Sequence, residues 1–214
     1  MLKEVYKNIK AIFFDVDDVL IQGRDENGNY RWKKNIYEDL GVLIEETPKL
    51  FNHKWPDVLL GKIDTLDRIS EFLSEIDVKI SANDFLNYWL KNDAKFDNQM
   101  LNLAQTLKDH GYPLYLATNQ DKYRSKYLYD TLSLKNIFSD IYSSSFIGLK
   151  KPDPEYFKTL EHRVQLMPDE ILIIDDSLEN VNSAIKCGWM GYQHHNFIKT
   201  QNDLLSCLRA YRNF

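Results

Sequence analysis

Three short runs of apolar residues, each followed by polar side chains, constrain the fold of this chain most. They cover residues 11–14, 113–117 and 171–174. Continuous apolar runs of this length are typical of β-strands that are buried on both faces. Such strands occur mainly in parallel sheets that helices cover on both sides, so the runs predict an α/β fold.

Helical patterns separate the strand-like runs. Apolar residues recur at helical spacing over residues 100–107, and Gly111 follows them as a C-terminal cap. Asp153 and Pro154 offer an N-cap and a proline at the first helical position, ahead of the third run. The alternation of strands and helices predicts a doubly wound parallel sheet.

A long segment after the first strand interrupts this alternation. The dipeptide Asn27-Gly28 permits the positive φ angles of a tight hairpin turn, so we expect a two-stranded flap there. Amphipathic helical patterns follow at residues 34–46, 62–75 and 82–92. These features predict a helical lid that is inserted into the sheet domain.

We therefore predict two domains. Residues 1–20 and 97–214 would form the α/β core, and residues 21–96 would form the flap hairpin and an α-helical cap. In the cap, Tyr30-Arg31-Trp32 and His53-Lys54-Trp55 place basic residues beside aromatic ones. Such side chains can contact a sugar or a nucleotide, and they can equally be ordinary packing of the cap.

The composition is that of a globular protein and limits its partners. The chain carries 27 Lys+Arg and 32 Asp+Glu, a formal charge of −5, and 43% of its residues are hydrophobic. The basic residues are scattered, whereas nucleic-acid binding needs a basic stripe. With two cysteines, a charged N-terminus and no apolar run near the ~18 residues of a membrane span, we predict a cytoplasmic protein without nucleic-acid or membrane partners. The oligomeric state stays open.

Polar residues at the ends of the predicted strands indicate a chemical site, because ligands of open parallel sheets bind beyond the carboxyl ends of the strands. These residues are Asp15, Asp17 and Asp18 after the first run, Thr118 and Asn119 after the second, Asp175 and Asp176 after the third, and the Lys150-Lys151-Pro152 segment. Two carboxylates ~5 Å apart repel by roughly 3 kcal/mol at an effective dielectric of ~20, so protons or a cation must accompany them. Oxygen ligands alone favour Mg²⁺, and a hydroxyl, an ammonium and a metal facing a carboxylate describe a phosphoryl-transfer site.

Four strings of the sequence, in this order, resemble the four motifs of the haloacid dehalogenase (HAD) superfamily. They are IFFDVDDVL at 12–20, LATN at 116–119, GLKKPDPEYF at 148–157 and ILIIDDSLENV at 171–181. An insertion after the first motif is similar to the helical caps of the C1-type phosphatase branch. The resemblance implies a Rossmann-like, doubly wound core with an inserted α-helical cap domain.

The resemblance also implies a role for each matching residue. Asp15 would be the nucleophile that forms an aspartyl phosphate. Asp17 would be the acid that protonates the leaving oxygen and then the base that activates water. Thr118, Asn119 and Lys151, the lysine directly before the proline, would bind the phosphate.

The metal ligands that the resemblance implies are all aspartates. Asp15, the backbone carbonyl of Asp17 and Asp176 would bind Mg²⁺, with Asp175 as a second or water-mediated ligand. Relatives keep one acid at the position of Asp176, which favours it as the direct ligand.

The second acid of the first motif favours one reaction type. The dehalogenases that named the superfamily lack an aspartate at the position of Asp17, whereas its phosphatases have one. We therefore expect a Mg²⁺-dependent, HAD-like phosphohydrolase that acts on a small phosphorylated metabolite. Two alternatives stay open: a sugar phosphomutase of the same family, and a non-catalytic binding or regulatory protein that keeps the fold.

Overall fold

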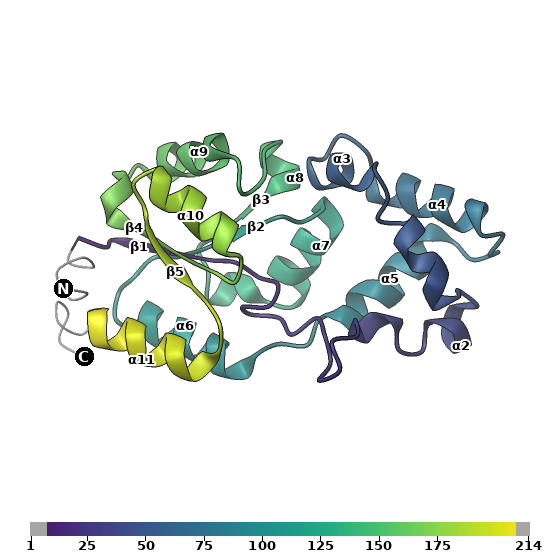
Figure 1. Cartoon of the computed structure of the whole chain (residues 1–214), viewed down its shortest axis with the longest axis horizontal. Coiled ribbons are helices and arrows are strands. Elements are labelled where there is room, and N and C mark those ends of the chain that lie inside the picture. Colours follow the sequence, from purple (N-terminus) through teal and green to yellow (C-terminus); the bar gives the residue numbers. More distant parts are fainter. Residues whose placement is uncertain (1–7, 209–214) are drawn as a thin grey trace.

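A parallel sheet organises the structure, a computed structural model that describes residues 8–208 (Figure 1). Its strands are β1 (Ala11–Phe14), β2 (Leu114–Thr118), β3 (Asp140–Ser143), β4 (Ile171–Asp175) and β5 (Met190–Gln193). Their spatial order is β3-β2-β1-β4-β5, and every pairing is parallel. This arrangement confirms the predicted α/β fold class. Residues 1–7 and 209–214, the two ends of the predicted core domain, lie outside the described residues.

The apolar runs predict the three inner strands but miss the two edge strands, β3 and β5. Each edge strand pairs on one side only, and every residue of β5 is partly exposed. In β3, Asp140 is exposed and only the last two residues are buried. An edge strand does not need a continuous apolar run, so it lacks the pattern that identifies the inner strands.

Helices and helical turns connect the strands. They are η1 (Arg31–Lys33), α2 (Ile36–Leu40), η2 (Ile44–Lys49), α3 (Trp55–Leu59), α4 (Thr65–Glu75), α5 (Ala82–Asp93), α6 (Asn98–Asp109), α7 (Lys122–Lys126), the π-helical η3 (Tyr127–Thr131), η4 (Leu134–Asn136), α8 (Ser144–Ile147), α9 (Pro154–Val164), η5 (Pro168–Glu170), α10 (Leu178–Lys186) and α11 (Phe197–Leu208). Among residues 8–208, no helix combines the length and the apolar character that crossing a membrane requires.

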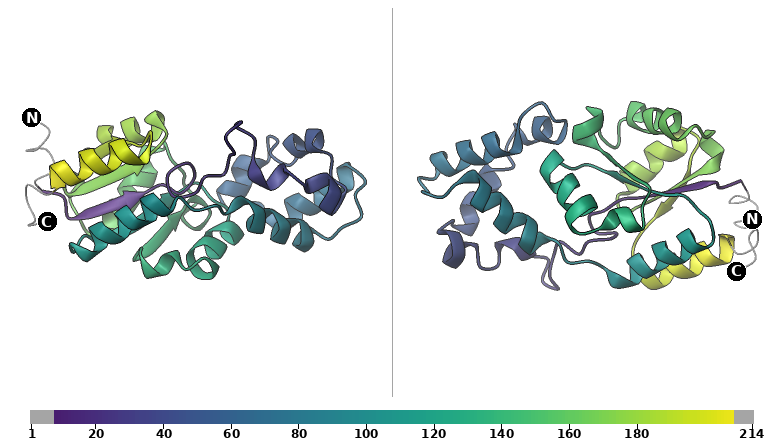
Figure 2. Two further views of the ribbon diagram at one scale, coloured as in Figure 1. Left: turned by 90° about the horizontal axis from the view of Figure 1, so that it is seen from below. Right: turned by 180° about the vertical axis from the view of Figure 1, so that it is seen from behind.

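Side chains of the central strand alternate between two hydrophobic layers. Ile12 and Phe14 pack into the layer that α6 and α11 cover, and Phe13 packs into the layer that α9 and α10 cover. Figures 1 and 2 show these two helix pairs on opposite faces of the sheet. Phe13 is fully buried, with its ring centroid 5.0 Å from those of both Tyr115 and Trp189.

The helices between β1 and α6 form a third hydrophobic cluster beside the sheet (Figure 2). Trp32, Phe72 and Phe85 are buried in this cluster. Asp64 and Ser81 cap the N-termini of α4 and α5, because their side chains accept backbone N–H groups of the first turn. A separate core of this kind supports the division into two domains at residues 21–96, which stays a prediction.

The segment predicted as a two-stranded flap is a hairpin loop with one ladder bridge, between Arg24 and Tyr30. Gly28 has a φ of 81°, whereas Asn27 does not have a positive φ. The carboxylate of Asp25 accepts the backbone N–H groups of Asn27 and Asn29, both at 2.9 Å. These side-chain bonds organise the loop in place of a longer ladder.

The position of Phe13 leads to a prediction about stability. Replacing Phe13 with Ala removes a fully buried ring that contacts the rings of Tyr115, Tyr142 and Trp189. We expect the variant F13A to lose about 3–5 kcal/mol of unfolding free energy, measured by urea denaturation. The control I198A changes a side chain that is 69% exposed on α11 and should stay within about 0.5 kcal/mol of the wild type. Equal losses in the two variants would contradict the burial of Phe13.

Candidate active site

The ends of the three inner strands bring the predicted site residues to one edge of the sheet. Asp15 follows β1, Thr118 is the last residue of β2, and Asp175 is the last residue of β4. Because β1 lies between β2 and β4 in the sheet, these three positions are neighbours. The strand order therefore gathers residues that lie far apart in the sequence at the place where such sheets bind ligands.

A buried lysine joins two of the aspartates. The ammonium of Lys151 lies 2.9 Å from a carboxylate oxygen of Asp15 and 2.6 Å from one of Asp175. Burial alone would lower the pKa of Lys151, but the charges of Asp15 and Asp175 raise it above its ordinary value. The lysine is therefore a permanent cation in the site.

Asn119 holds Lys151 in place from the end of β2. The backbone N–H of Lys151 donates to the side-chain oxygen of Asn119, and the Asn119 amide donates to the Lys151 carbonyl, both at 2.9 Å. Both side-chain atoms of Asn119 are thus used within the protein. Asn119 therefore positions the backbone of Lys151, and its predicted contact with phosphate stays a prediction.

Asp15, Asp175 and Asp176 form an acidic cluster, in which the candidate ligand oxygens lie within 4.8 Å of one another. Burial raises the pKa of Asp15 to about 7; Lys151 opposes this rise, whereas Asp175 and Asp17 add to it. Burial, together with the charges of Asp175 and Asp18, also raises the pKa of Asp176. A divalent cation that prefers oxygen ligands would relieve this repulsion, so the donor set fits Mg²⁺.

Within the acidic cluster, Asp175 already accepts several hydrogen bonds from the protein. Its oxygens accept from Lys151 at 2.6 Å, from the backbone N–H of Ser177 at 2.9 Å and from the Asn180 amide at 3.0 Å. Asp175 is fully buried, whereas Asp176 is partly exposed. This difference supports Asp176 as the direct ligand, with Asp175 holding the lysine.

Thr118 carries a hydroxyl that the protein leaves free. The residue is 1% exposed, and the hydroxyl has no hydrogen-bond partner anywhere in residues 8–208. Burying a hydroxyl without a hydrogen-bond partner costs free energy, and a bound ligand can supply the missing partner. Thr118 therefore offers a hydrogen bond to an oxygen of a bound group.

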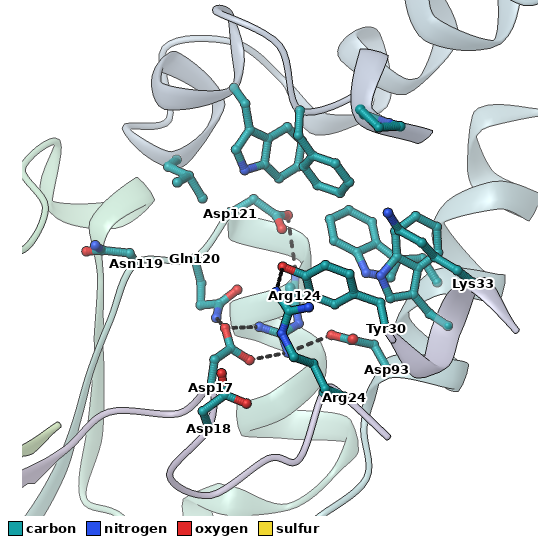
Figure 3. Close-up of a pocket in the computed structure, with 17 residues that line it drawn as sticks. Asp17, Asp18, Arg24, Tyr30, Lys33, Asp93, Asn119, Gln120, Asp121 and Arg124 are labelled. Atoms are coloured by element: carbon teal, nitrogen blue, oxygen red, sulfur yellow. Dashed lines mark hydrogen bonds and ion pairs between the residues drawn. The ribbon is translucent and has the colours of Figure 1, made fainter. Parts of the chain in front are cut away.

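Asp17 lies apart from the acidic cluster in a set of bonds that the sequence analysis missed. Its two oxygens accept from the guanidinium of Arg124 at 2.7 and 2.9 Å, and the Gln120 amide donates to one of them at 2.5 Å (Figure 3). Burial would raise the pKa of Asp17, but Arg124 and Gln120 together hold it below its ordinary value. Arg124 also pairs with Asp93, the last residue of α5, at 2.7 Å.

One sequence signal points to this missed arginine. Asp121 caps the start of α7 by accepting the backbone N–H groups of Tyr123 and Arg124. Such a cap directly after the end of β2 places the first turn of α7 at the edge of the sheet that carries the site.

A pocket of about 500 Å³ opens beside Asp17 and extends under the cap (Figure 3). Asn119, Gln120 and Arg124 line its core side. Its cap side carries aromatic residues, including Tyr30, Trp32, Trp55 and Trp89 of the cap segment. Its volume suits a small-molecule ligand.

Comparisons with known proteins identify the family. The model of the haloacid dehalogenase-like hydrolase family matches residues 9–188, so this chain belongs to that family. A sesquiterpene phosphatase of Aspergillus oryzae is 26% identical over 85% of this chain and 88% of its own length. The flavin mononucleotide hydrolase 1 of Arabidopsis thaliana is 26% identical over 92% of this chain and 77% of its own length.

A solved structure shares the fold. It is a HAD family enzyme from Bacteroides thetaiotaomicron in complex with magnesium and inorganic phosphate, with a TM-score of 0.72 and 24% identity over 87% of this chain and 94% of that chain. The family and the fold confirm the resemblance that the four motifs carry. Membership of the helical-cap branch stays a prediction.

The acidic cluster leads to a prediction about metal binding. Mg²⁺ that binds only the folded protein should stabilise it by about 2.7 kcal/mol at 100 times its Kd, seen as a rise in Tm. The variant D176N removes one carboxylate charge of the cluster and should lose most of this rise. The control E179Q changes an exposed acid three residues away and should keep it. An equal rise in wild type and D176N would contradict the assignment.

Proposed function

We propose that this protein is a Mg²⁺-dependent phosphatase that hydrolyses a small phosphate monoester. One observation carries the proposal: the unpaired, buried hydroxyl of Thr118 stands on the strand next to the Asp15–Lys151 pair. A hydroxyl and an ammonium at this edge of the sheet can bind the phosphoryl oxygens, and the carboxylate can attack the phosphorus.

The proposed reaction has two steps. A carboxylate oxygen of Asp15 attacks phosphorus, the bond from phosphorus to the ester oxygen breaks, and the departing oxygen takes a proton from Asp17. Water then gives a proton to Asp17 and attacks phosphorus, which releases phosphate and restores Asp15. Thr118 and Lys151 hold the phosphoryl oxygens in both steps. Mg²⁺, when bound at Asp15 and Asp176, would neutralise negative charge on these oxygens.

The bonds to Asp17 suit one half of this cycle. Arg124 and Gln120 keep Asp17 ionised, which is the form that accepts a proton from water. Donation to the leaving oxygen needs the protonated form, so the Arg124 contact must loosen during the first step.

Two relatives support hydrolysis of phosphate esters without fixing the substrate. By their names, one acts on sesquiterpene phosphates and the other on flavin mononucleotide. These leaving groups share little beyond the ester bond. The leaving group that this chain accepts must therefore follow from the residues of its own pocket.

The test is release of inorganic phosphate from p-nitrophenyl phosphate, with and without Mg²⁺. We expect D15N to lose about 10³-fold or more in kcat, equivalent to about 4 kcal/mol, because the attacking oxygen is altered. The proposal would be contradicted if D15N released phosphate at the wild-type rate, or if the wild type released phosphate at the same rate with and without Mg²⁺. Isomerisation of a sugar phosphate without phosphate release would favour the phosphomutase.

Thr118 gives a second, finer test. The variant T118V replaces the hydroxyl with a methyl group of similar size and should lower kcat/KM about 10- to 100-fold, the value of a hydrogen bond to a charged group. The control T106V alters a threonine of α6 whose hydroxyl donates to the Asn102 carbonyl of the same helix and should keep wild-type kcat/KM. An unchanged kcat/KM in T118V would show that the Thr118 hydroxyl does not bind the phosphate.

A further inference from the structure

We propose that the pocket under the cap binds the leaving group of the substrate, and that this leaving group is a flat aromatic ring bearing an oxygen acceptor such as a carboxylate or carbonyl. The inference rests on the proposed phosphatase function and names the substrate class. We argue it from the position of the pocket, from its aromatic wall and from the ammonium of Lys33, which has no carboxylate partner among residues 8–208.

The position of the pocket assigns it to the leaving group. Asp17, which would protonate the ester oxygen, lies on its core side (Figure 3). Asp15, Thr118 and Lys151, which would hold the phosphoryl group, are not among the residues that line it. An ester whose phosphorus lies at Asp15 and whose oxygen lies at Asp17 therefore extends its remaining atoms into this pocket.

The cap side of the pocket is aromatic. Five of its apolar residues are aromatic and only two, Pro48 and Leu59, are aliphatic. Three of the four tryptophans of the chain belong to this wall. The ring of Phe51 lies 4.8 Å from that of Trp55, and both of these side chains are partly exposed. Partly exposed rings in this arrangement offer faces and edges on which another flat ring can stack.

Two cations flank the aromatic wall. The guanidinium of Arg24 lies 3.8 Å from the centre of the Tyr30 ring, and the ammonium of Lys33 lies 5.0 Å from the same centre (Figure 3). Arg24 is already engaged, because it donates to the Gly28 carbonyl at 2.8 Å and to the Tyr30 hydroxyl at 2.5 Å and its charge acts on the Asp18 carboxylate. The ammonium of Lys33, within residues 8–208, forms no ion pair with a carboxylate. By contrast, Asp17 and Asp93 of this pocket are already paired with Arg124.

Lys33 favours an aromatic leaving group with an acceptor oxygen over a purely aliphatic one. A prenyl or alkyl chain in this pocket would displace water from the ammonium of Lys33 without replacing its hydrogen bonds, at a cost in free energy. A flat ring with an acceptor oxygen stacks on the wall and supplies that oxygen to Lys33. A three-carbon ester would leave most of a cavity of about 500 Å³ unfilled.

The experiment compares two esters with matched leaving-group chemistry, benzyl phosphate and cyclohexylmethyl phosphate. Both release a primary alcohol, so they differ mainly in the flatness of the ring. We expect kcat/KM to be about 5- to 10-fold higher for benzyl phosphate. A third ester, 4-carboxybenzyl phosphate, should gain about a further 10-fold from its contact with Lys33.

Variants locate these preferences in the pocket. The variant W55L should reduce the preference for benzyl over cyclohexylmethyl phosphate, whereas K33M should remove the gain from the carboxyl group and keep the ring preference. The matched control K34M alters an exposed neighbour that does not line the pocket and should keep both preferences.

Binding separates this inference from the proposed function. The Kd of each ester for D15N is measured by quenching of tryptophan emission, so it does not depend on turnover. If no ester releases phosphate, the proposed function fails, while a tighter Kd for the aromatic esters still supports the pocket assignment. Equal values for benzyl and cyclohexylmethyl phosphate in turnover or binding, or binding of neither ester, overturn the inference.

Discussion

The ammonium of Lys151 between Asp15 and Asp175 is the interaction on which the rest of the site depends. Burying two carboxylates at neighbouring strand ends is costly, and a paired, hydrogen-bonded cation offsets that cost. The sheet order makes the pairing possible, because β1 and β4 are adjacent and the loop before α9 carries Lys151 back to their ends. Asn119 and Asn180 complete the arrangement by holding the lysine backbone and the Asp175 carboxylate.

A second ion-pair set connects the site to the cap. Arg124 contacts Asp17 in the loop after β1 and Asp93 at the end of α5, so a single guanidinium joins the proposed acid and base to the last cap helix. The hydrophobic cluster of the cap places its aromatic side chains over the same region. Arg124 therefore contacts the proposed acid and base and also lines the pocket proposed for the leaving group.

The sequence predicts the parts of this structure that local patterns encode. Continuous apolar runs identify β1, β2 and β4. The polar residues at the ends of these runs include Asp15, Thr118 and Asp175, and they can be predicted as site residues because the carboxyl ends of parallel strands lie at the same edge of the sheet. The edge strands β3 and β5 carry no such run. The bonds from Arg124 and Gln120 to Asp17 depend on how the segments after β1 and β2 meet, and the pocket depends on how the cap meets the core. No local pattern encodes either contact.

In the proposed reaction, Asp15 at the end of β1 is the group that attacks phosphorus. Mass spectrometry of the wild-type protein, acid-quenched during turnover of a phosphate ester with Mg²⁺, tests this most directly. We expect one added phosphoryl group on the peptide that contains Asp15, and no such group when Mg²⁺ is left out. A phosphoryl group on another residue, or turnover with Asp15 unmodified at every quench time, would contradict it.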